Sequence, residues 1–370
     1  MNKKIAVLAG DGIGPEVTEQ AIKVMEAVAQ RFGHEFSYES ADVGAIAIDR
    51  HGDPLPDSTL QTCLNADAIL FGAIGDPKYD NDPNAPVRPE QGLLRLRKAL
   101  GLFCNIRPVQ TYPKLLRLSP LKEEKVKDVD FVIYRELTSG IYFGKKHRSE
   151  DGQSAYDQCF YSVSEIDRIS RLAFEAALRR RKKLLLVDKA NVLESSRLWR
   201  DTVTKIHKDY PDVELAYMFV DNAAMQIIQY PAQFDVVLTS NMFGDILSDE
   251  ASVLTGSMGL LPSASIGTAN ALFEPIHGSY PQAAGKDMAN PMAAILSAAM
   301  LLDHLGMVDE AAAVRHAVYR CLEEGIGTPD LDTQVHYSCS QTGDVLSSLV
   351  LDENFQLNKG NISESMSTII

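Results

Sequence analysis

The sequence lacks the features of a membrane-bound or disulfide-stabilised protein. No stretch of its 370 residues approaches the roughly 20 consecutive apolar residues that a membrane-spanning helix needs. Only five apolar residues, 5–9, precede Gly10, too few for the hydrophobic region of a signal peptide. The five cysteines are odd in number and form no CxxC pair, so neither a disulfide framework nor a thiolate zinc site is expected. These absences predict a cytoplasmic protein.

Basic side chains are also in short supply. The chain has 36 lysines and arginines against 50 aspartates and glutamates, a formal net charge of −14 at pH 7. Because such a surface repels phosphate backbones, we expect no nucleic-acid partner. Hydrophobic residues make up 45% of the chain, which is typical of a globular protein, and its length predicts about two domains.

Short apolar runs alternate with helical patterns. The first run, 5–9, ends at the glycine turn GDGIGP, and helical spacing follows over 16–31. Similar runs occur at 68–71, 131–133, 184–187, 215–218 and 236–238, and helical patterns at 164–180, 195–209 and 291–323. This alternation predicts an α/β protein with a central, mostly parallel sheet.

Two segments depart from this alternation. Residues 144–162 begin with basic and polar side chains and gain strand character from Tyr156 to Ser162. They predict a surface loop or an arm that pairs with another subunit. The polar stretch 353–370 has no periodicity and is expected to fray.

The glycine turn does not fit the dinucleotide-binding fingerprint. A GxGxxG motif that starts at Gly10 needs a glycine where Pro15 stands, and one that starts at Gly12 needs a glycine where Val17 stands. Two interpretations remain: a plain strand-to-helix turn, or a close approach of the backbone to a ligand.

The segment SNMFGDILSD could hold a cation. It follows the run 236–238, so its acidic residues lie at the carboxyl edge of a sheet, where α/β proteins build sites. On a helix, Asp245 and Asp249 share one face; their repulsion of roughly 0.2–0.5 kcal/mol would be offset by a divalent cation. Carboxylate oxygens favour Mg²⁺ or Mn²⁺ over zinc. The alternative is a solvated acidic helix start.

Other candidate residues are ambiguous when taken singly. Converging arginines would recognise carboxylates through bidentate hydrogen bonds, but each one could equally form a surface ion pair. The same holds for a lysine at a strand end, a tyrosine in a glycine-bounded loop and a histidine in the loop pattern EPIHGS. These residues are Arg95, Arg97 in a predicted helix, Arg107, Arg135 directly after a strand, Lys189, Tyr142 and His277.

Together, the segments resemble the β-decarboxylating dehydrogenases of 2-hydroxy acids, which act on isopropylmalate, isocitrate, homoisocitrate or tartrate. The resemblance covers residue 5 to about 345 and rests on GDGIGPEV, GLLRLRKALGLFCNIRP, VIYRELTSGIYFG, VDKANVLESSRLWR, VDNAAMQI, NMFGDILSDEASVLTGSMGL and EPIHGS. It implies an NAD-dependent oxidoreductase that needs Mg²⁺ or Mn²⁺, and a homodimer with active sites between two domains. The implied fold is not a Rossmann fold. Its cofactor-binding domain is 1–102 with 257–370, and 103–256 is the substrate, metal and dimerisation domain, with an arm at about 144–162.

The family's site residues carry over position by position. The resemblance implies that Lys189 and Asp221 reach in from the partner subunit. The implied roles are substrate-carboxylate binding for Arg97, Arg107 and Arg135; metal binding for Asp221, Asp245 and Asp249, with Asp221 also facing substrate; acid–base catalysis for Tyr142 and Lys189; and cofactor binding for Ile13, Glu274, His277, Gly278 and Asn290.

Substrate and cofactor preference depend on two short segments. On a helix, Leu93 and Leu94 adjoin Arg97, and this apolar patch beside a carboxylate-binding group suits a malate backbone that carries a branched alkyl group, as in isopropylmalate. Burial of three such carbons would contribute roughly 2–3 kcal/mol. Gln282 stands where NAD-using relatives commonly have an acidic residue; since it offers no positive charge to a 2′-phosphate, NAD is favoured over NADP.

Three alternatives remain. A sister enzyme could act on isocitrate, homoisocitrate or tartrate, although two leucines would leave a third carboxylate unpaired. A non-catalytic regulatory subunit would be expected to lack some of Tyr142, Lys189 or the aspartates, all of which are present. A structural α/β protein would leave the arginines and aspartates unexplained.

Overall fold

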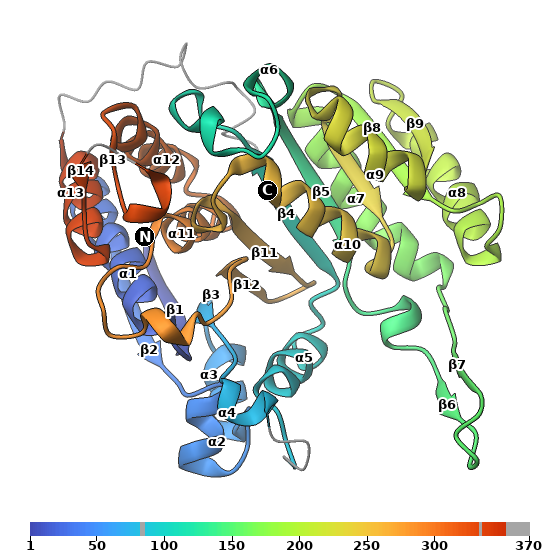
Figure 1. The fold of residues 1–370 in the computed structure, drawn as a ribbon, viewed down its shortest axis with the longest axis horizontal. Coiled ribbons are helices and arrows are strands. Elements are labelled where there is room, and N and C mark those ends of the chain that lie inside the picture. The colour runs from blue at the N-terminus through green and yellow to red at the C-terminus, as the bar shows by residue number, and fades with distance from the viewer. Residues whose placement is uncertain (82–85, 333–334, 353–370) are drawn as a thin grey trace. The chain divides into compact units, whose positions relative to one another are not determined.

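The computed structural model describes residues 1–81, 86–332 and 335–352, and it is an α/β protein with mostly parallel sheet strands, as predicted (Figure 1). The stretch 353–370, which was expected to fray, lies outside the described residues. The chain divides into two compact units. The first contains Met1–Leu102, Tyr112–Leu118 and Thr255–Ile370, and the second contains Phe103–Thr111 and Ser119–Leu254. No helix in the described part of the chain is long and apolar enough to cross a membrane.

In the first unit the strands follow the order β2-β1-β3-β12-β11. Strand β1 (Asn2–Gly10) pairs in parallel with β2 (Glu35–Ser40) and β3 (Ala68–Ala73), which confirms the strands predicted at 5–9 and 68–71. Strand β12 (Ala271–Pro275) runs parallel to β3 and antiparallel to β11 (Pro262–Ile266). Every residue of β3, β11 and β12 is buried, as expected for strands covered on both faces.

The helices of the first unit include the predicted N-terminal helix. Helix α1 (Gly14–Phe32) packs against α11 (Met292–His304) and α13 (Cys339–Leu351). The helical pattern over 291–323 forms two helices, α11 and α12 (Val308–Glu323), because the chain turns at Gly306, whose φ is 77°. The remaining helices are α2 (Ala45–His51), α3 (Asp57–Leu64), α4 (Pro77–Asp80) and α5 (Pro89–Ala99), and a short pair of strands is formed by β13 (Ile326–Gly327) and β14 (Val335–His336).

In the second unit the strand order is β4-β5-β10-β8-β9. Strand β4 (Cys104–Gln110) is antiparallel to β5 (Asp130–Glu136), and β10 (Val236–Thr239), β8 (Lys183–Asp188) and β9 (Glu214–Phe219) continue in parallel, so the four predicted strands are confirmed. The helices are α6 (Glu123–Val126), α7 (Val163–Arg179), α8 (Glu194–Ile206), α9 (Val220–Gln229) and α10 (Asn241–Ser252). Helices α7 and α8 match the predicted patterns, although the second pattern ends in a 3-10 turn, His207–Asp209.

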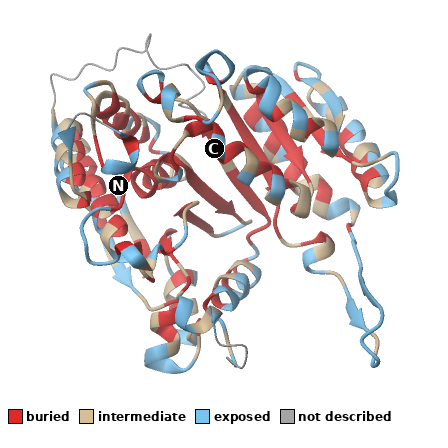
Figure 2. Ribbon diagram, viewed as in Figure 1, coloured by how far each residue is buried: buried red, intermediate tan, exposed pale blue. Residues whose placement is uncertain are grey.

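The segment 144–162 forms an exposed hairpin. Strand β6 (Lys146–Arg148) pairs antiparallel with β7 (Ala155–Asp157), and all six residues are exposed (Figure 2). The strand expected from Tyr156 to Ser162 is therefore shorter and begins one residue earlier. Ser162 instead caps α7: its hydroxyl accepts the amide hydrogen of Glu165.

Two local predictions are wrong. Arg135 lies within β5 rather than directly after a strand, and EPIHGS is not wholly a loop because Glu274 and Pro275 end β12. Other 3-10 turns lie at Pro113–Leu118, Gly140–Tyr142, Pro231–Gln233, Val253–Thr255, Met258–Leu260, Pro281–Ala283 and Pro329–Leu331.

Candidate active site

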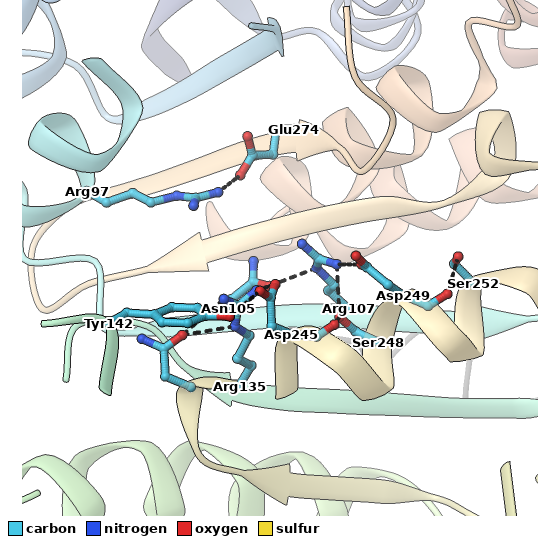
Figure 3. Close-up of polar contacts among 11 residues, drawn as sticks. Arg97, Asn105, Arg107, Arg135, Tyr142, Asp245, Ser248, Asp249, Ser252 and Glu274 are labelled. Atoms are coloured by element: carbon cyan, nitrogen blue, oxygen red, sulfur yellow. Dashed lines mark hydrogen bonds and ion pairs between the residues drawn. The ribbon is translucent and has the colours of Figure 1, made fainter. Parts of the chain in front are cut away.

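One carboxylate in the second unit holds two candidate residues. Asp245 lies on α10, which begins two residues after β10, and its Oδ1 accepts a hydrogen bond from Nη1 of Arg135 in β5 (Figure 3). Its Oδ2 accepts the phenolic hydrogen of Tyr142 at 2.8 Å. The guanidinium carbon of Arg135 lies 6.0 Å from the centre of the Tyr142 ring. Burial and the Asp245 carboxylate raise the pKa of the Tyr142 phenol, so the phenol remains protonated at neutral pH.

A second pair lies one turn further along the same helix. Arg107 of β4 donates Nη1 to Asp249 Oδ1 at 2.7 Å and to Ser248 Oγ at 2.9 Å, while its Nε donates to Asn105 Oδ1 at 3.0 Å (Figure 3). The Asp249 side chain is 71% exposed, whereas that of Arg107 is 17% exposed. The structure thus brings Arg107, Arg135 and Tyr142 to the face of α10 that carries Asp245 and Asp249.

The chemistry of these donors fits a hard divalent cation. Asp245 and Asp249 offer carboxylate oxygens four residues apart on one helix, which are donors that Mg²⁺ and Mn²⁺ accept. A full ligand set is not assembled by one chain: within residues 1–81, 86–332 and 335–352, no group of three His, Cys, Asp or Glu side chains could hold a metal ion. In the structure the two carboxylates are paired with arginines instead.

Lys189 and Asp221 form a pair of their own. Lys189 directly follows β8, Asp221 is the second residue of α9, and the ammonium donates to Asp221 Oδ1 at 2.7 Å. The hydrogen bond from Lys189 lowers the pKa of the Asp221 carboxyl. The backbone amide of Lys189 donates to Ser196 Oγ at 3.0 Å, which fixes the start of this loop. The pair therefore presents an amine and a carboxylate together.

In the first unit, Arg97 retains an unused donor. Its Nη2 donates to Glu274 Oε1 at 2.7 Å, and the two side chains are 17% and 10% exposed (Figure 3). Nε of Arg97 is buried, and no hydrogen-bond partner for it lies among the described residues. A ligand carboxylate would satisfy this donor. On the same helix, α5, Leu93 is partly buried against the core and Leu94 is 50% exposed.

The glycine turn is explained by contact with the chain itself. Gly12 has a φ of 60°, and a Cβ there would lie 1.9 Å from the carbonyl oxygen of Ser279. The next amide, that of Ile13, donates to the same carbonyl at 2.8 Å. The close backbone approach that the glycines permit therefore holds the segment after His277 beside Ile13.

The other residues assigned to the cofactor are unevenly placed. Nε2 of His277 is buried without a hydrogen-bond partner among the described residues, and desolvation lowers the pKa of this imidazole. Such an orphaned nitrogen fits a polar cofactor group. Asn290 is buried and donates to Asp330 at 3.1 Å, whereas Gly278 and Gln282 are exposed.

Several residues that support the site were missed at the sequence level. Asn105 and Ser248 hold Arg107, and Asn241 accepts two hydrogen bonds from Arg135. Asn241 is the first residue of α10 and is 1% exposed. Its place in the NMFGD motif, directly after a predicted strand end, was the one signal available.

Comparison with known proteins agrees with this architecture. The family described as "Isocitrate/isopropylmalate dehydrogenase" matches residues 4–346. A Bacteroides fragilis protein named 3-isopropylmalate dehydrogenase is 56% identical over 334 residues, which cover 90% of this chain and 94% of that protein. A Bacillus subtilis protein of the same name is 55% identical over 347 residues, 92% of this chain and 95% of that protein.

Solved structures are similar across nearly the whole chain. Isocitrate dehydrogenase from Methylococcus capsulatus has a TM-score of 0.84 at 36% identity, covering 94% of this chain and 99% of that one. A β-decarboxylating dehydrogenase from Thermococcus kodakarensis has a TM-score of 0.79 at 34% identity, covering 95% and 96% of the two chains. The isocitrate dehydrogenase-like fold expected from the sequence is confirmed.

Proposed function

The chain belongs to the isocitrate/isopropylmalate dehydrogenase family, and from this premise we propose that it oxidatively decarboxylates 3-isopropylmalate to 4-methyl-2-oxopentanoate and CO₂, with reduction of NAD, in leucine biosynthesis. The observation that carries the substrate assignment is the identity of 55–56% to relatives named for this activity. The chemistry is supported by the carboxylate of Asp245, which holds a guanidinium and a phenol at once.

Arginines in both units are the proposed ligands of the substrate carboxylates. Arg97 has a buried, unused Nε. Arg107 and Arg135 are oriented by the neutral amide oxygens of Asn105 and Asn241, and each also pairs with an aspartate. Leu94, half exposed beside Arg97 on α5, is the proposed contact for the isopropyl group, with Leu93 behind it. Burial of that group would contribute roughly 2–3 kcal/mol.

Asp245 and Asp249, with Asp221 of the partner subunit, would hold Mg²⁺ or Mn²⁺. When bound, the cation supplies Lewis acidity toward the oxygen at C2. NAD, when bound, would supply the acceptor for the hydride of C2, and the residues proposed to hold it are Ile13, Glu274, His277, Gly278, Gln282 and Asn290. Exposed Gln282 adds no positive charge for a 2′-phosphate, which supports NAD over NADP.

Lys189 and Tyr142 are the residues proposed to accept and donate protons. Lys189, held beside Asp221, would as the neutral amine take the proton of the C2 hydroxyl while hydride leaves for the cofactor. The C3 carboxylate then departs as CO₂, and its bonding electrons pass to the C2–C3 enolate. Tyr142, whose pKa is raised, would return one proton to C3. The steps balance: one hydride leaves C2, one proton leaves the C2 hydroxyl for Lys189, one CO₂ leaves C3, and one proton from Tyr142 is added to C3.

A homodimer is proposed because the second unit exposes apolar side chains on two neighbouring helices. Met225 and Ile228 of α9 are 53% and 46% exposed, and Ile246 of α10 is 57% exposed. The hairpin at 146–157 adds exposed Tyr156. Large apolar side chains exposed on neighbouring helices support an interface there. We assign the metal contacts, the dimer contacts and the substrate contacts of Arg107 and Arg135 to the second unit, and the cofactor contacts, with Arg97 and Leu94, to the first.

The test is a spectrophotometric assay of NADH or NADPH formation with 3-isopropylmalate, isocitrate and tartrate, each with and without Mg²⁺. We expect activity with 3-isopropylmalate and NAD that requires the cation. A higher kcat/KM with isocitrate or tartrate would reject the substrate assignment. Formation of NADH or NADPH when none of these substrates is present would not support it.

A further inference from the structure

Asn241 connects two parts of the proposed site through one buried side chain. Its Oδ1 accepts hydrogen bonds from Nε and Nη2 of Arg135 at 3.2 and 3.0 Å. Its Nδ2 donates to the carbonyl oxygen of Ser139 at 3.1 Å. Because the oxygen must face the guanidinium and the nitrogen must face the carbonyl, only one orientation of this amide satisfies both partners.

Ser139 leads directly into the turn that carries Tyr142. The Ser139 amide donates to Glu136 Oε2 at 2.9 Å, and Gly140 follows with a φ of 77°. A Cβ at Gly140 would lie 2.2 Å from Oη of Tyr161, so the turn packs tightly against that ring. Oη of Tyr161 in turn accepts the backbone N–H of Asn241 at 2.9 Å. Asn241 thus contacts the turn directly and through Tyr161.

The choice of amide over carboxylate at position 241 has an electrostatic consequence. Arg135 is 6% exposed, and an aspartate at position 241 would place a second carboxylate on its guanidinium in addition to Asp245. A neutral acceptor orients the guanidinium without adding a second negative charge to the one that Asp245 already supplies. Helix capping does not account for Asn241, because the residue at the N-cap is Ser240.

We propose that Asn241 is a positioning residue that fixes Arg135 and the Tyr142-bearing turn relative to each other. The group that binds the substrate and the group that delivers a proton to C3 are thereby held in matching positions. This inference rests on the proposed function, because it assigns substrate binding to Arg135 and proton transfer to Tyr142. Asn241 touches neither substrate nor cofactor; it acts through the two residues that do.

The test compares Asn241→Leu with the control Thr239→Val. Thr239 is equally buried and lies two residues away, and its hydroxyl donates to the carbonyl of Val187 rather than to the Tyr142 turn. We expect Asn241→Leu to raise KM for the hydroxy acid at least about tenfold and to lower kcat by about 10- to 100-fold, since small misplacements have effects of this size. The dissociation constant for NAD should stay within about twofold, and Thr239→Val should change none of these values by more than about twofold.

Double variants separate positioning from general destabilisation. If Asn241 acts through its two partners, the double variant Asn241→Leu/Tyr142→Phe should have the same kcat as Tyr142→Phe alone. Likewise, the double variant Asn241→Leu/Arg135→Lys should have a KM no higher than that of Arg135→Lys alone. Multiplicative effects in both pairs would overturn the proposal. Should Asn241→Leu not fold, Asn241→Asp keeps the acceptor but loses the donor to Ser139, and the Tyr142→Phe cycle is run on that background.

Hydrogen exchange gives a result that is independent of turnover. Asn241→Leu or Asn241→Asp should speed amide exchange across 138–143, whereas Thr239→Val should not. Unchanged exchange there would overturn the proposal even if activity fell. If the wild type prefers isocitrate or tartrate, the proposed function fails, but the same double-variant cycles are run with that substrate. If it oxidises none of these substrates, hydrogen exchange alone decides whether Asn241 holds the Tyr142-bearing turn.

Discussion

At the scale of single residues, Asp245 contacts both the arginine proposed to bind substrate and the tyrosine proposed to donate a proton. Its two oxygens hold Nη1 of Arg135 and Oη of Tyr142 from separate segments of the chain. A cation bound to this carboxylate would compete with the guanidinium, so metal binding and the orientation of Arg135 are expected to be linked. The hydrogen bond from Tyr142 keeps the phenol directed at the same place.

Tyr142→Phe removes the phenolic proton while it keeps the ring. We expect turnover to fall by about 10²- to 10⁴-fold, the usual contribution of a positioned general acid. The affinity for NAD, measured by titration of the protein without substrate, should not change, because the hydroxyl contacts Asp245 in the second unit. Turnover equal to that of the wild type would remove Tyr142 from the role of proton donor.

Asp245→Asn tests the proposed metal ligand. The amide keeps the shape of the side chain but loses the negative charge, so the Mg²⁺ concentration for half-maximal activity should rise at least about tenfold. The matched control is Asp201→Asn, an exposed aspartate on α8. Mg²⁺ titrations of the two variants and the wild type are compared; if Asp245→Asn saturates at the wild-type Mg²⁺ concentration, Asp245 is not a ligand.

Residue identities were easier to predict than their contacts. The spacing of Asp245 and Asp249 placed them on one helix face, and α10 confirms this. The role of Asn241 could not be predicted, because its partners Arg135 and Ser139 lie 106 and 102 residues away along the chain. An asparagine after a strand has many local uses, and only tertiary structure selects one of them.

At the scale of elements, helix α10 approaches strand β5 unusually closely. A Cβ at Gly244 would lie 2.6 Å from Cγ and 2.7 Å from Cβ of Arg135. These atoms belong to the fixed base of the side chain, not to its flexible end. Absence of a side chain at Gly244 is therefore what allows Arg135 to lie under α10 and still reach Asp245.

Gly244→Ala should displace Arg135. Alanine gains about 1 kcal/mol in helix propensity, but overpacking of a close contact costs about 1–3 kcal/mol, so the clash should prevail. We expect a lower melting temperature and a KM for the hydroxy acid that rises by about tenfold or more. The measurements are calorimetry and steady-state kinetics. A melting temperature above that of the wild type with an unchanged KM would show that α10 moves away without effect on Arg135.

Strands were predictable where their side chains are uniformly apolar. The runs that became β3, β5, β8 and β10 are buried and rich in Val, Ile and Leu. Strands β4, β11 and β12 escaped prediction because Pro108, Pro262 and Pro275 interrupt or end them and resemble loop signals. The charged side chain of Arg107 is a further break in the apolar pattern of β4.

At the scale of the whole molecule, the net charge of the chain has the same sign as the charge of its proposed ligands, so the two repel each other. The chain carries −14 at pH 7, whereas its proposed substrate and cofactor are anions. We propose that local arginines offset this repulsion: Arg107 and Arg135 are mostly buried, their Nε groups are held by the neutral amides of Asn105 and Asn241, and each also pairs with an aspartate. Low dielectric surroundings strengthen the attraction between such buried cations and a ligand carboxylate.

The dimer prediction follows from the division of acid and base between subunits. If each site takes Tyr142 from one chain and Lys189 of the partner subunit, a heterodimer of one Tyr142→Phe chain and one Lys189→Met chain has one intact site and one doubly altered site. Co-expressed chains with different affinity tags, purified in tandem, should recover about half of the wild-type activity, although each homodimer is nearly inactive.

A second heterodimer provides the control. Arg135 and Tyr142 contact the same Asp245 within one chain, so pairing a Tyr142→Phe chain with an Arg135→Lys chain leaves no intact site and should recover nothing. The two heterodimers differ in one respect: within one proposed active site, Arg135 comes from the same chain as Tyr142, whereas Lys189 comes from the other chain. Absence of recovery in the first mixture would mean that Lys189 serves the site of its own chain, and the exposed apolar faces of α9 and α10 would then need another explanation. Recovery in the second mixture would mean that Arg135 and Tyr142 of one chain serve different sites, against their shared contact with Asp245.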